Sequence, residues 1–153
     1  MQLKQRLSKD NTIITLVNSN VAKNGYKFVF EKPSEICLTC NLRKVCVERL
    51  EQGRIYEIIK VRDKKHFCKL LNDFVSVVEV KLSPIEIFVE RRIALEGVIV
   101  SYNPIECKTT CLNKSLCAPL GLFKNDKIKI EKILHHIKCQ NGKNLAKVLV
   151  TII

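Results

Sequence analysis

The chain has 153 residues, of which 46% are hydrophobic and 27% charged, and its formal net charge is +12. No apolar run approaches the roughly 18 residues that a membrane-spanning helix needs, and residues 1–11 lack the apolar stretch of a secretory signal. These features argue against a membrane protein or an exported one and predict a cytoplasmic protein. A strongly basic balance is typical of proteins that contact polyanions, most often nucleic acid.

In chain order, residues 1–11 are predicted to form a disordered basic tail, and residues 12–153 a single compact domain. Strand patterns dominate that domain, with alternating apolar residues or runs of Val and Ile. One helix is predicted over residues 42–52, ending at Gly53, and Pro119 and Gly121 predict a shorter helix in the second half. The fold class is therefore mainly β, with α+β as the alternative. The predicted strands include 13–17, 54–61, 77–82, 85–89, 127–131 and 148–153.

The cysteine pattern is written twice along the chain, and other residues repeat with it. The two copies share the spacing of five residues inside the cysteine loop and of 21 residues before the last cysteine. We infer an internal duplication, with repeats 12–82 and 83–153 packed about a pseudo-twofold axis. Asn141-Gly142 predicts a type I′ hairpin turn after the last cysteine. The two sets are Cys37, Cys40, Cys46 and Cys68, then Cys107, Cys111, Cys117 and Cys139.

Each set is predicted to form one four-thiolate metal site. Thiolates are soft ligands that suit zinc or iron–sulfur clusters. Zinc ribbons usually take their ligands as two close pairs, whereas three clustered cysteines and one remote cysteine suit the four iron corners of a cube. Two 4Fe–4S clusters are therefore the first interpretation, two zinc ions the second, and disulfides or free thiols the third. The triad spacing is similar to that of the iron–sulfur staple in RecB-type nucleases. His66, His135 and His136 are interpreted as solvated side chains.

The sequence points away from an enzyme. Four protein thiolates saturate a zinc ion or a cube, which leaves no open position for substrate or water. A loose nuclease pattern, in which Asp63 and Glu79 would hold magnesium and Lys81 would assist the attacking water, is a remote alternative. The second repeat has Val150-Thr151-Ile152 at that place. The pattern is short and common on alternating strands.

A candidate nucleic-acid surface surrounds the first cysteine set. Basic residues crowd ahead of Cys68 and inside the first triad, and metal-braced loops would present them to phosphates. Tyr26, Phe28, Phe30 and Tyr102 are interpreted mainly as core residues, although exposed aromatic rings can stack on bases. The candidate contacts are Arg43, Lys44, Lys60, Arg62, Lys64, Lys65 and Lys69.

From about Ile13 to Ile153 the chain resembles an archaeal family of uncharacterised proteins, the family numbered 0179. The resemblance rests on Cys37-Leu-Thr-Cys40 with Cys46, on the segment 53–63, on His66-Phe-Cys68, on Val77-Val78-Glu79-Val80, on Ser83-Pro84-Ile85-Glu86, on Glu96-Gly97, and on the second cysteine set from Pro104 to Cys139. It implies an archaeal cytoplasmic protein with two cysteine sites and implies no activity. Lys81 departs from the family pattern, in which an acidic residue is expected.

The leading hypothesis is a binding module, in which two metal sites brace basic loops that contact RNA or DNA. The alternative is an iron–sulfur redox carrier, which would pass electrons to a partner. A scaffold within a larger protein complex is the third hypothesis.

Overall fold

The computed structural model describes residues 12–107 and 111–153, so the predicted tail, 1–11, lies outside the described residues. The chain divides into two compact units, Met1–Ser83 (unit 1) and Pro84–Ile153 (unit 2). The division falls at Ser83-Pro84, between two strands. Each unit contains one four-stranded antiparallel sheet and short helices, so the prediction of a mainly β protein is confirmed.

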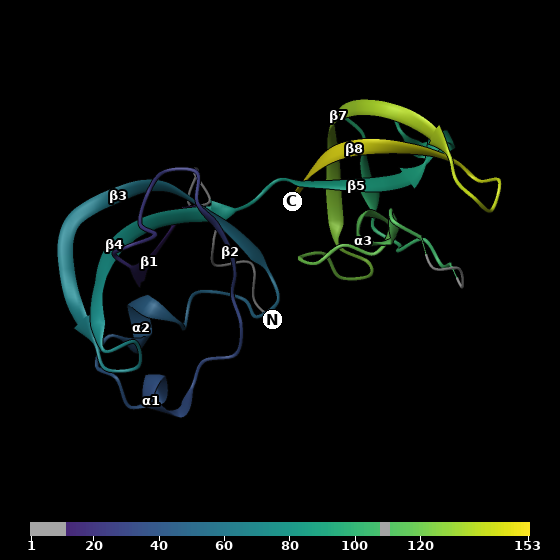
Figure 1. Cartoon of the computed structure of the whole chain (residues 1–153). Helices are drawn as coiled ribbons and strands as arrows, with labels where there is room; N and C mark the ends of the chain where they lie inside the picture. Colours follow the sequence, from purple (N-terminus) through teal and green to yellow (C-terminus); the bar gives the residue numbers. More distant parts are fainter. Residues whose placement is uncertain (1–11, 108–110) are drawn as a thin grey trace. The chain divides into compact units, whose positions relative to one another are not determined.

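The sheet of unit 1 has the strand order β1-β4-β3-β2 (Figure 1). Its long strands β3 and β4 form a strongly curved ribbon, and α1 and α2 lie within the curve. Two four-residue helices precede β3. The elements are β1 (Ile13–Asn18), β2 (Lys27–Val29), α1 (Glu35–Leu38), α2 (Arg43–Cys46), β3 (Ile55–Cys68) and β4 (Asp73–Leu82).

Unit 2 repeats this topology with the strand order β5-β8-β7-β6. One short helix, α3, takes the place of α2, and a 3₁₀ helix, η2, follows the first strand. The elements are β5 (Ile85–Glu90), η2 (Arg91–Ile93), β6 (Ile99–Ser101), α3 (Lys114–Cys117), β7 (Lys127–Lys138) and β8 (Asn144–Ile152).

The two units share irregular features as well as strand order. The ladder shifts register between Ile58 and Lys60 in β3, and between Ile130 and Lys132 in β7. In each unit a glycine with positive φ, Gly25 or Gly97, donates its N–H to the carbonyl of the isoleucine before that shift. These correspondences agree with two similar halves. The predicted duplication and pseudo-twofold axis remain predictions.

Each unit has its own aliphatic core. In unit 1, Ile58, Val78 and Val80 are fully buried, and the partly buried Tyr26, Phe28 and Phe30 pack against them. In unit 2 the core is a single cluster that includes Ile87, Ile130 and Val148, with Tyr102 buried beside them. The prediction that these four aromatic residues belong mainly to the core is confirmed.

The predicted helix 42–52 is wrong in its length, because α2 spans only four residues. In a longer helix the Cys46 carbonyl would accept the N–H of Leu50. Here it accepts the Thr15 hydroxyl at 2.7 Å, and the Leu50 N–H bonds to Val47 instead. The expected difference between the repeats is also wrong, since α3 has the same length as α2.

The predicted turn after Cys139 lies where expected but has another geometry. Gly142 has φ +80, whereas Asn141 does not have the positive φ that a type I′ turn requires. The Gly142 N–H donates to the Cys139 carbonyl at 2.9 Å, and the Cys139 N–H to the Lys143 carbonyl at 2.9 Å. The turn therefore spans residues 139–143.

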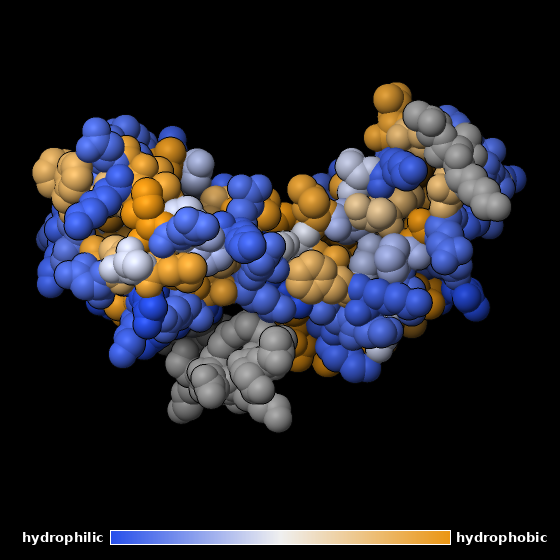
Figure 2. Space-filling view, turned by 90° about the horizontal axis from the view of Figure 1, so that it is seen from below, coloured by the Kyte–Doolittle hydropathy of each residue, from blue (hydrophilic) through white to orange (hydrophobic). Residues whose placement is uncertain are grey.

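Polar side chains cover much of the surface in both units. Figure 2 shows blue hydrophilic groups over most of the viewed face, with orange hydrophobic groups between them. Within the described part of the chain, no helix is long and apolar enough to cross a membrane.

Candidate metal centres

Unit 1 gathers its four cysteines from three separate elements around one cavity. Cys37 lies in α1, Cys40 in the turn that follows, Cys46 at the end of α2 and Cys68 at the end of β3. The first three come from one short loop, while β3 carries the fourth cysteine back to that loop from 22 positions further along the chain. The sequence spacing predicted this gathering of thiols.

The second cysteine of each triad accepts a backbone hydrogen bond at its sulfur. The Leu42 N–H points to the Cys40 Sγ, and the Asn113 N–H points to the Cys111 Sγ, each at 3.4 Å. Both donors stand two residues after the cysteine. Hydrogen bonds of this kind stabilise the negative charge of a thiolate and tune metal centres. The same local turn therefore directs a backbone N–H at one sulfur in each unit.

Cys46 is the sulfur of unit 1 that is least ready to ionise in the absence of a cation. Burial raises its pKa to about 11, and the negative charges of Cys37, Cys68 and Cys40 act in the same direction. This mutual repulsion arises because the four sulfurs lie near one another. A cation among them would reverse the effect, since coordination deprotonates a thiol outright.

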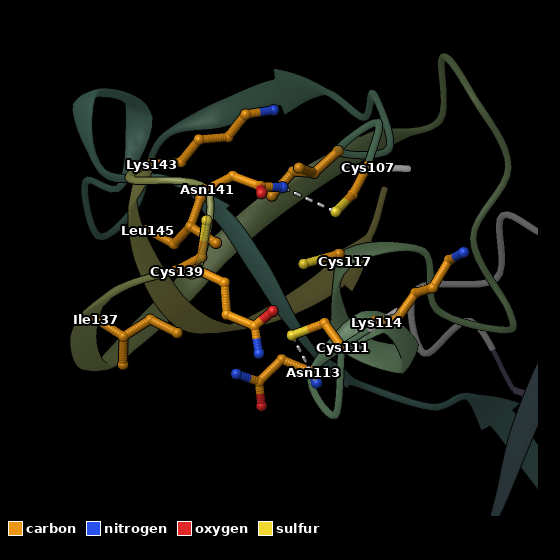
Figure 3. A pocket seen from close by; sticks show the side chains of 12 residues that line it. Cys107, Cys111, Asn113, Lys114, Cys117, Ile137, Cys139, Asn141, Lys143 and Leu145 are labelled. Carbon is orange, nitrogen blue, oxygen red and sulfur yellow. Dashed lines mark hydrogen bonds between the residues drawn. The ribbon is translucent and has the colours of Figure 1, made fainter. Parts of the chain in front are cut away.

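Unit 2 repeats the arrangement with four different anchors (Figure 3). Cys107 lies in the loop after β6, Cys111 and Cys117 precede and end α3, and Cys139 follows β7 directly. All four line one cavity, which Asn141 and Lys143 also border. The side chains of the four cysteines point toward this shared space.

Cys117 behaves as Cys46 does. Burial is the main cause that raises its pKa, and the charges of Cys111, Cys139 and Cys107 add to it, whereas the Lys143 ammonium lowers it. Burial, followed by the charges of Cys117 and Asp126, also raises the pKa of Tyr102 to about 12. The Tyr102 hydroxyl therefore stays protonated. It donates a hydrogen bond to the Cys117 carbonyl at 3.4 Å and so helps to position Cys117.

Two residues that contact sulfur were not predicted. The Asn141 Nδ2 donates to the Cys107 Sγ at 3.1 Å, and the Ser34 Oγ donates to the Cys37 Sγ at 3.6 Å. Sequence analysis treated Asn141 only as a turn residue. The only available signal was its position two residues after the last cysteine of the second set, which does not specify where the amide points.

In each unit the four thiols line the cavity but do not converge on a single point. Among the described residues, no group of three or more His, Cys, Asp or Glu side chains is placed to hold a metal ion. None of the eight cysteines, all of which lie in the described ranges, forms a disulfide. His66, His135 and His136 line neither cavity, which agrees with their interpretation as peripheral side chains.

The predicted basic residues lie on a strand more than on loops. Pairing with β4 extends β3 to Cys68, beyond the predicted end of the strand at Val61, so Arg62, Lys64 and Lys65 belong to its exposed surface. The Arg62 guanidinium contacts Glu79 at 3.0 Å. Arg43 contacts Glu48 and the Leu38 carbonyl. Lys44, Lys60, Lys64, Lys65 and Lys69 are exposed, and no ion pair among the described residues includes them.

Two exposed aromatic rings beside this surface were missed. Phe67 and Phe74 are paired across β3 and β4, are 51% and 55% exposed, and meet edge to face with ring centroids 5.7 Å apart. The sequence around Phe67 and Phe74 suggests strands, and aromatic side chains on strands are usually buried. The structure instead leaves both rings about half exposed, near the end where β3 and β4 join.

The nuclease pattern gains no support from the structure. Glu79 contacts Arg62, and its neighbour across the ladder is Lys60. Lys81 lies opposite Glu57. Asp63 is exposed and falls in the irregular stretch of β3 between Val61 and Lys65.

The fold and the sites together define a class: a two-unit antiparallel β protein with four thiols around one cavity in each unit. The chain belongs to the Uncharacterised protein family (UPF0179), whose model matches residues 13–150. It is 37% identical to a UPF0179 protein of Methanocaldococcus jannaschii over 96% of this chain and 98% of the relative. It is 40% identical to one of Pyrococcus abyssi over 90% of this chain and 96% of the relative.

A UPF0179 protein of Methanosarcina acetivorans is 37% identical over 93% of this chain and 97% of the relative. No solved structure matches the chain.

Proposed function

We propose that the protein binds metal through two four-thiolate sites, one in each unit. The observation that carries the proposal is the same in both units: three cysteines of one loop and a fourth from 22 positions further along line one cavity, and an equivalent backbone N–H points at the second sulfur. Burial, and after it the charges of the neighbouring thiolates, raise the pKa of Cys46 and of Cys117. A bound cation opposes that rise.

Iron–sulfur clusters and zinc ions both suit this donor set. A single zinc ion needs all four sulfurs within about 2.3 Å of one point, so the thiols would have to move inward. A cube distributes its thiolates over four separate irons, which suits the open arrangement of the sulfurs. The cavity of unit 2 is small, about 30 Å³, so a cube there would require the cysteine loop to move outward.

The deciding experiment is elemental analysis with a visible spectrum on protein purified without oxygen. About eight irons and eight sulfides per chain would mean two cubes, and the redox-carrier hypothesis would then lead. About two zincs in a colourless protein would mean closed structural sites, which favours the binding or scaffold hypotheses. A chain without metal would contradict the proposal.

A second function, binding of single-stranded RNA or DNA, is supported by the exposed pair Phe67 and Phe74. Exposed rings next to lysines are the elements that bind single strands, since the rings stack on bases while the lysines neutralise phosphates. Lys65 and Lys69 flank Phe67 in the sequence and are exposed. Metal at Cys68, the last residue of β3, would fix the end of this surface.

The test is the salt dependence of binding to a fluorescent oligonucleotide. We expect the double variant K64E/K65E to weaken binding and to flatten the dependence on salt. The variant F74A should cost about 1–3 kcal/mol with little change in that dependence. The control is K132E/K138E, which changes the net charge equally on exposed positions of β7. Equal effects of both double variants would point to net charge alone and count against this surface.

A further inference from the structure

The cavities that the cysteines line in the two units differ in volume. The cavity in unit 2 has a volume of about 30 Å³, close to that of one water molecule. The corresponding cavity in unit 1 has about 410 Å³. The donor sets are the same, so the difference comes from the residues around the thiols.

In unit 2 the turn between β7 and β8 is fastened to the cysteine loop. The Asn141 amide donates to the Cys107 Sγ at 3.1 Å, and the Lys143 ammonium donates to the Glu106 carbonyl at 3.2 Å. The turn is itself closed by the bonds between Cys139 and Lys143 and between Gly142 and Cys139. Two contacts over more than thirty residues of chain therefore hold the turn across the cavity (Figure 3).

In unit 1 the corresponding turn is not fastened in this way. Of the hydrogen bonds between described residues, none joins residues 69–72 to the cysteine loop, 34–46. The Cys37 sulfur receives its bond from Ser34, three residues away in the same loop. Leu70 and Leu71 are 45% and 47% exposed. Among the described residues, the turn of unit 1 therefore lacks the two hydrogen bonds that hold the turn of unit 2 to its cysteine loop.

We propose that the two sites are kinetically distinct: unit 1 holds a metal centre that exchanges with solutes, and unit 2 holds one that is retained. The inference rests on the proposed function. Exchange requires an incoming ligand to reach the metal, and the larger cavity of unit 1, about 410 Å³, leaves room for one. Hydrogen bonds from outside the ligand shell change metal affinity by about 10- to 100-fold, and the long-range bond of Asn141 belongs to this class.

The test is metal release from the protein as purified, mixed with excess 4-(2-pyridylazo)resorcinol, a coloured chelator of both zinc and ferrous iron. We expect two phases of equal amplitude whose rates differ by about tenfold or more. A single phase from protein that carries both metal centres would overturn this inference and leave the proposed function intact. Protein that carries no metal at the start would overturn both.

Two variants that keep every cysteine assign the phases. N141A should accelerate the slow phase about tenfold or more and leave the fast phase unchanged. S34A, which removes the donor to the equivalent sulfur in unit 1, is the matched control and should alter only the fast phase. The assignment is overturned if N141A alters the fast phase, or if neither variant changes either rate. Circular dichroism of both variants checks that the fold is retained.

Discussion

At the scale of single residues, the chemistry of the protein depends on how its thiols ionise. Cys46 and Cys117 end the two short helices that face the cavities, and burial and neighbouring thiolates raise the pKa of both. The sequence could predict that four thiols gather. It could not predict which of them would resist ionisation, because that depends on burial against β1 and β4, as the packing of Cys46 with Leu16 and Val75 shows.

We predict that Cys46 in reduced, metal-free protein reacts slowly with iodoacetamide. Because its pKa rises from 9.0 to about 11, its thiolate fraction near pH 8 should fall by about 100-fold. The rate in the folded protein should increase as the pH rises from 8 toward 11. Mass spectrometry of the modified peptide measures the rate, and the same residue in urea is the control. Equal rates in the folded and the unfolded chain would contradict the raised pKa.

At the scale of elements, the sequence predicted strands well and predicted their ends poorly. Alternation identified β5 and β7, whose residues Ile87, Val89, Ile128 and Ile130 meet the core. The ends of β3 and α2 depend on tertiary contacts: pairing with β4 extends β3 to Cys68, and the Thr15 hydroxyl takes the carbonyl that a longer α2 would have used. The hydrogen bond of Asn141 could not be predicted for the same reason, since its partner, Cys107, is 34 residues away.

We predict that T15V destabilises unit 1 by about 1–3 kcal/mol. Thr15 is 1% exposed, and the substitution keeps its shape but leaves the Cys46 carbonyl without the hydroxyl donor. Urea unfolding followed by circular dichroism measures the change. T39V is the matched control: the Thr39 hydroxyl donates to the Ile36 carbonyl at 3.2 Å, but it is exposed, so a change within about 0.5 kcal/mol is expected. If T15V also changed the free energy of unfolding by no more than about 0.5 kcal/mol, water would have replaced the hydrogen bond of the Thr15 hydroxyl.

At the scale of the whole molecule, two units with the same topology each contain a complete core and a complete set of four cysteines. The cluster of unit 2 is built from residues between Ile85 and Ile152 alone. The repeated cysteine spacing predicted two similar halves, and the strand orders agree with this prediction. Spacing could not predict that the turn after the last cysteine would be hydrogen-bonded to the cysteine loop in unit 2, because those bonds depend on single side chains, Asn141 and Lys143.

We predict that residues 84–153, expressed alone, fold and bind half as much metal as the whole chain. A domain of about 70 residues is marginal by itself, so metal binding should raise its melting temperature measurably. Circular dichroism and elemental analysis check the fold and the stoichiometry. The control is the same fragment with C117A, which should bind less metal. A fragment that remains unfolded with metal present would show that unit 2 depends on unit 1.

The exposed pair of phenylalanines also has an optical consequence. The chain contains no tryptophan, so it has no intrinsic fluorescence at wavelengths longer than the emission of tyrosine. Phe74 is 55% exposed and touches Phe67, which lines the cavity of unit 1. F74W would therefore place the one tryptophan of the chain beside the first set of thiols. An iron–sulfur cluster there would quench its emission, zinc would leave it bright, and the recovery of emission would report the departure of a cluster.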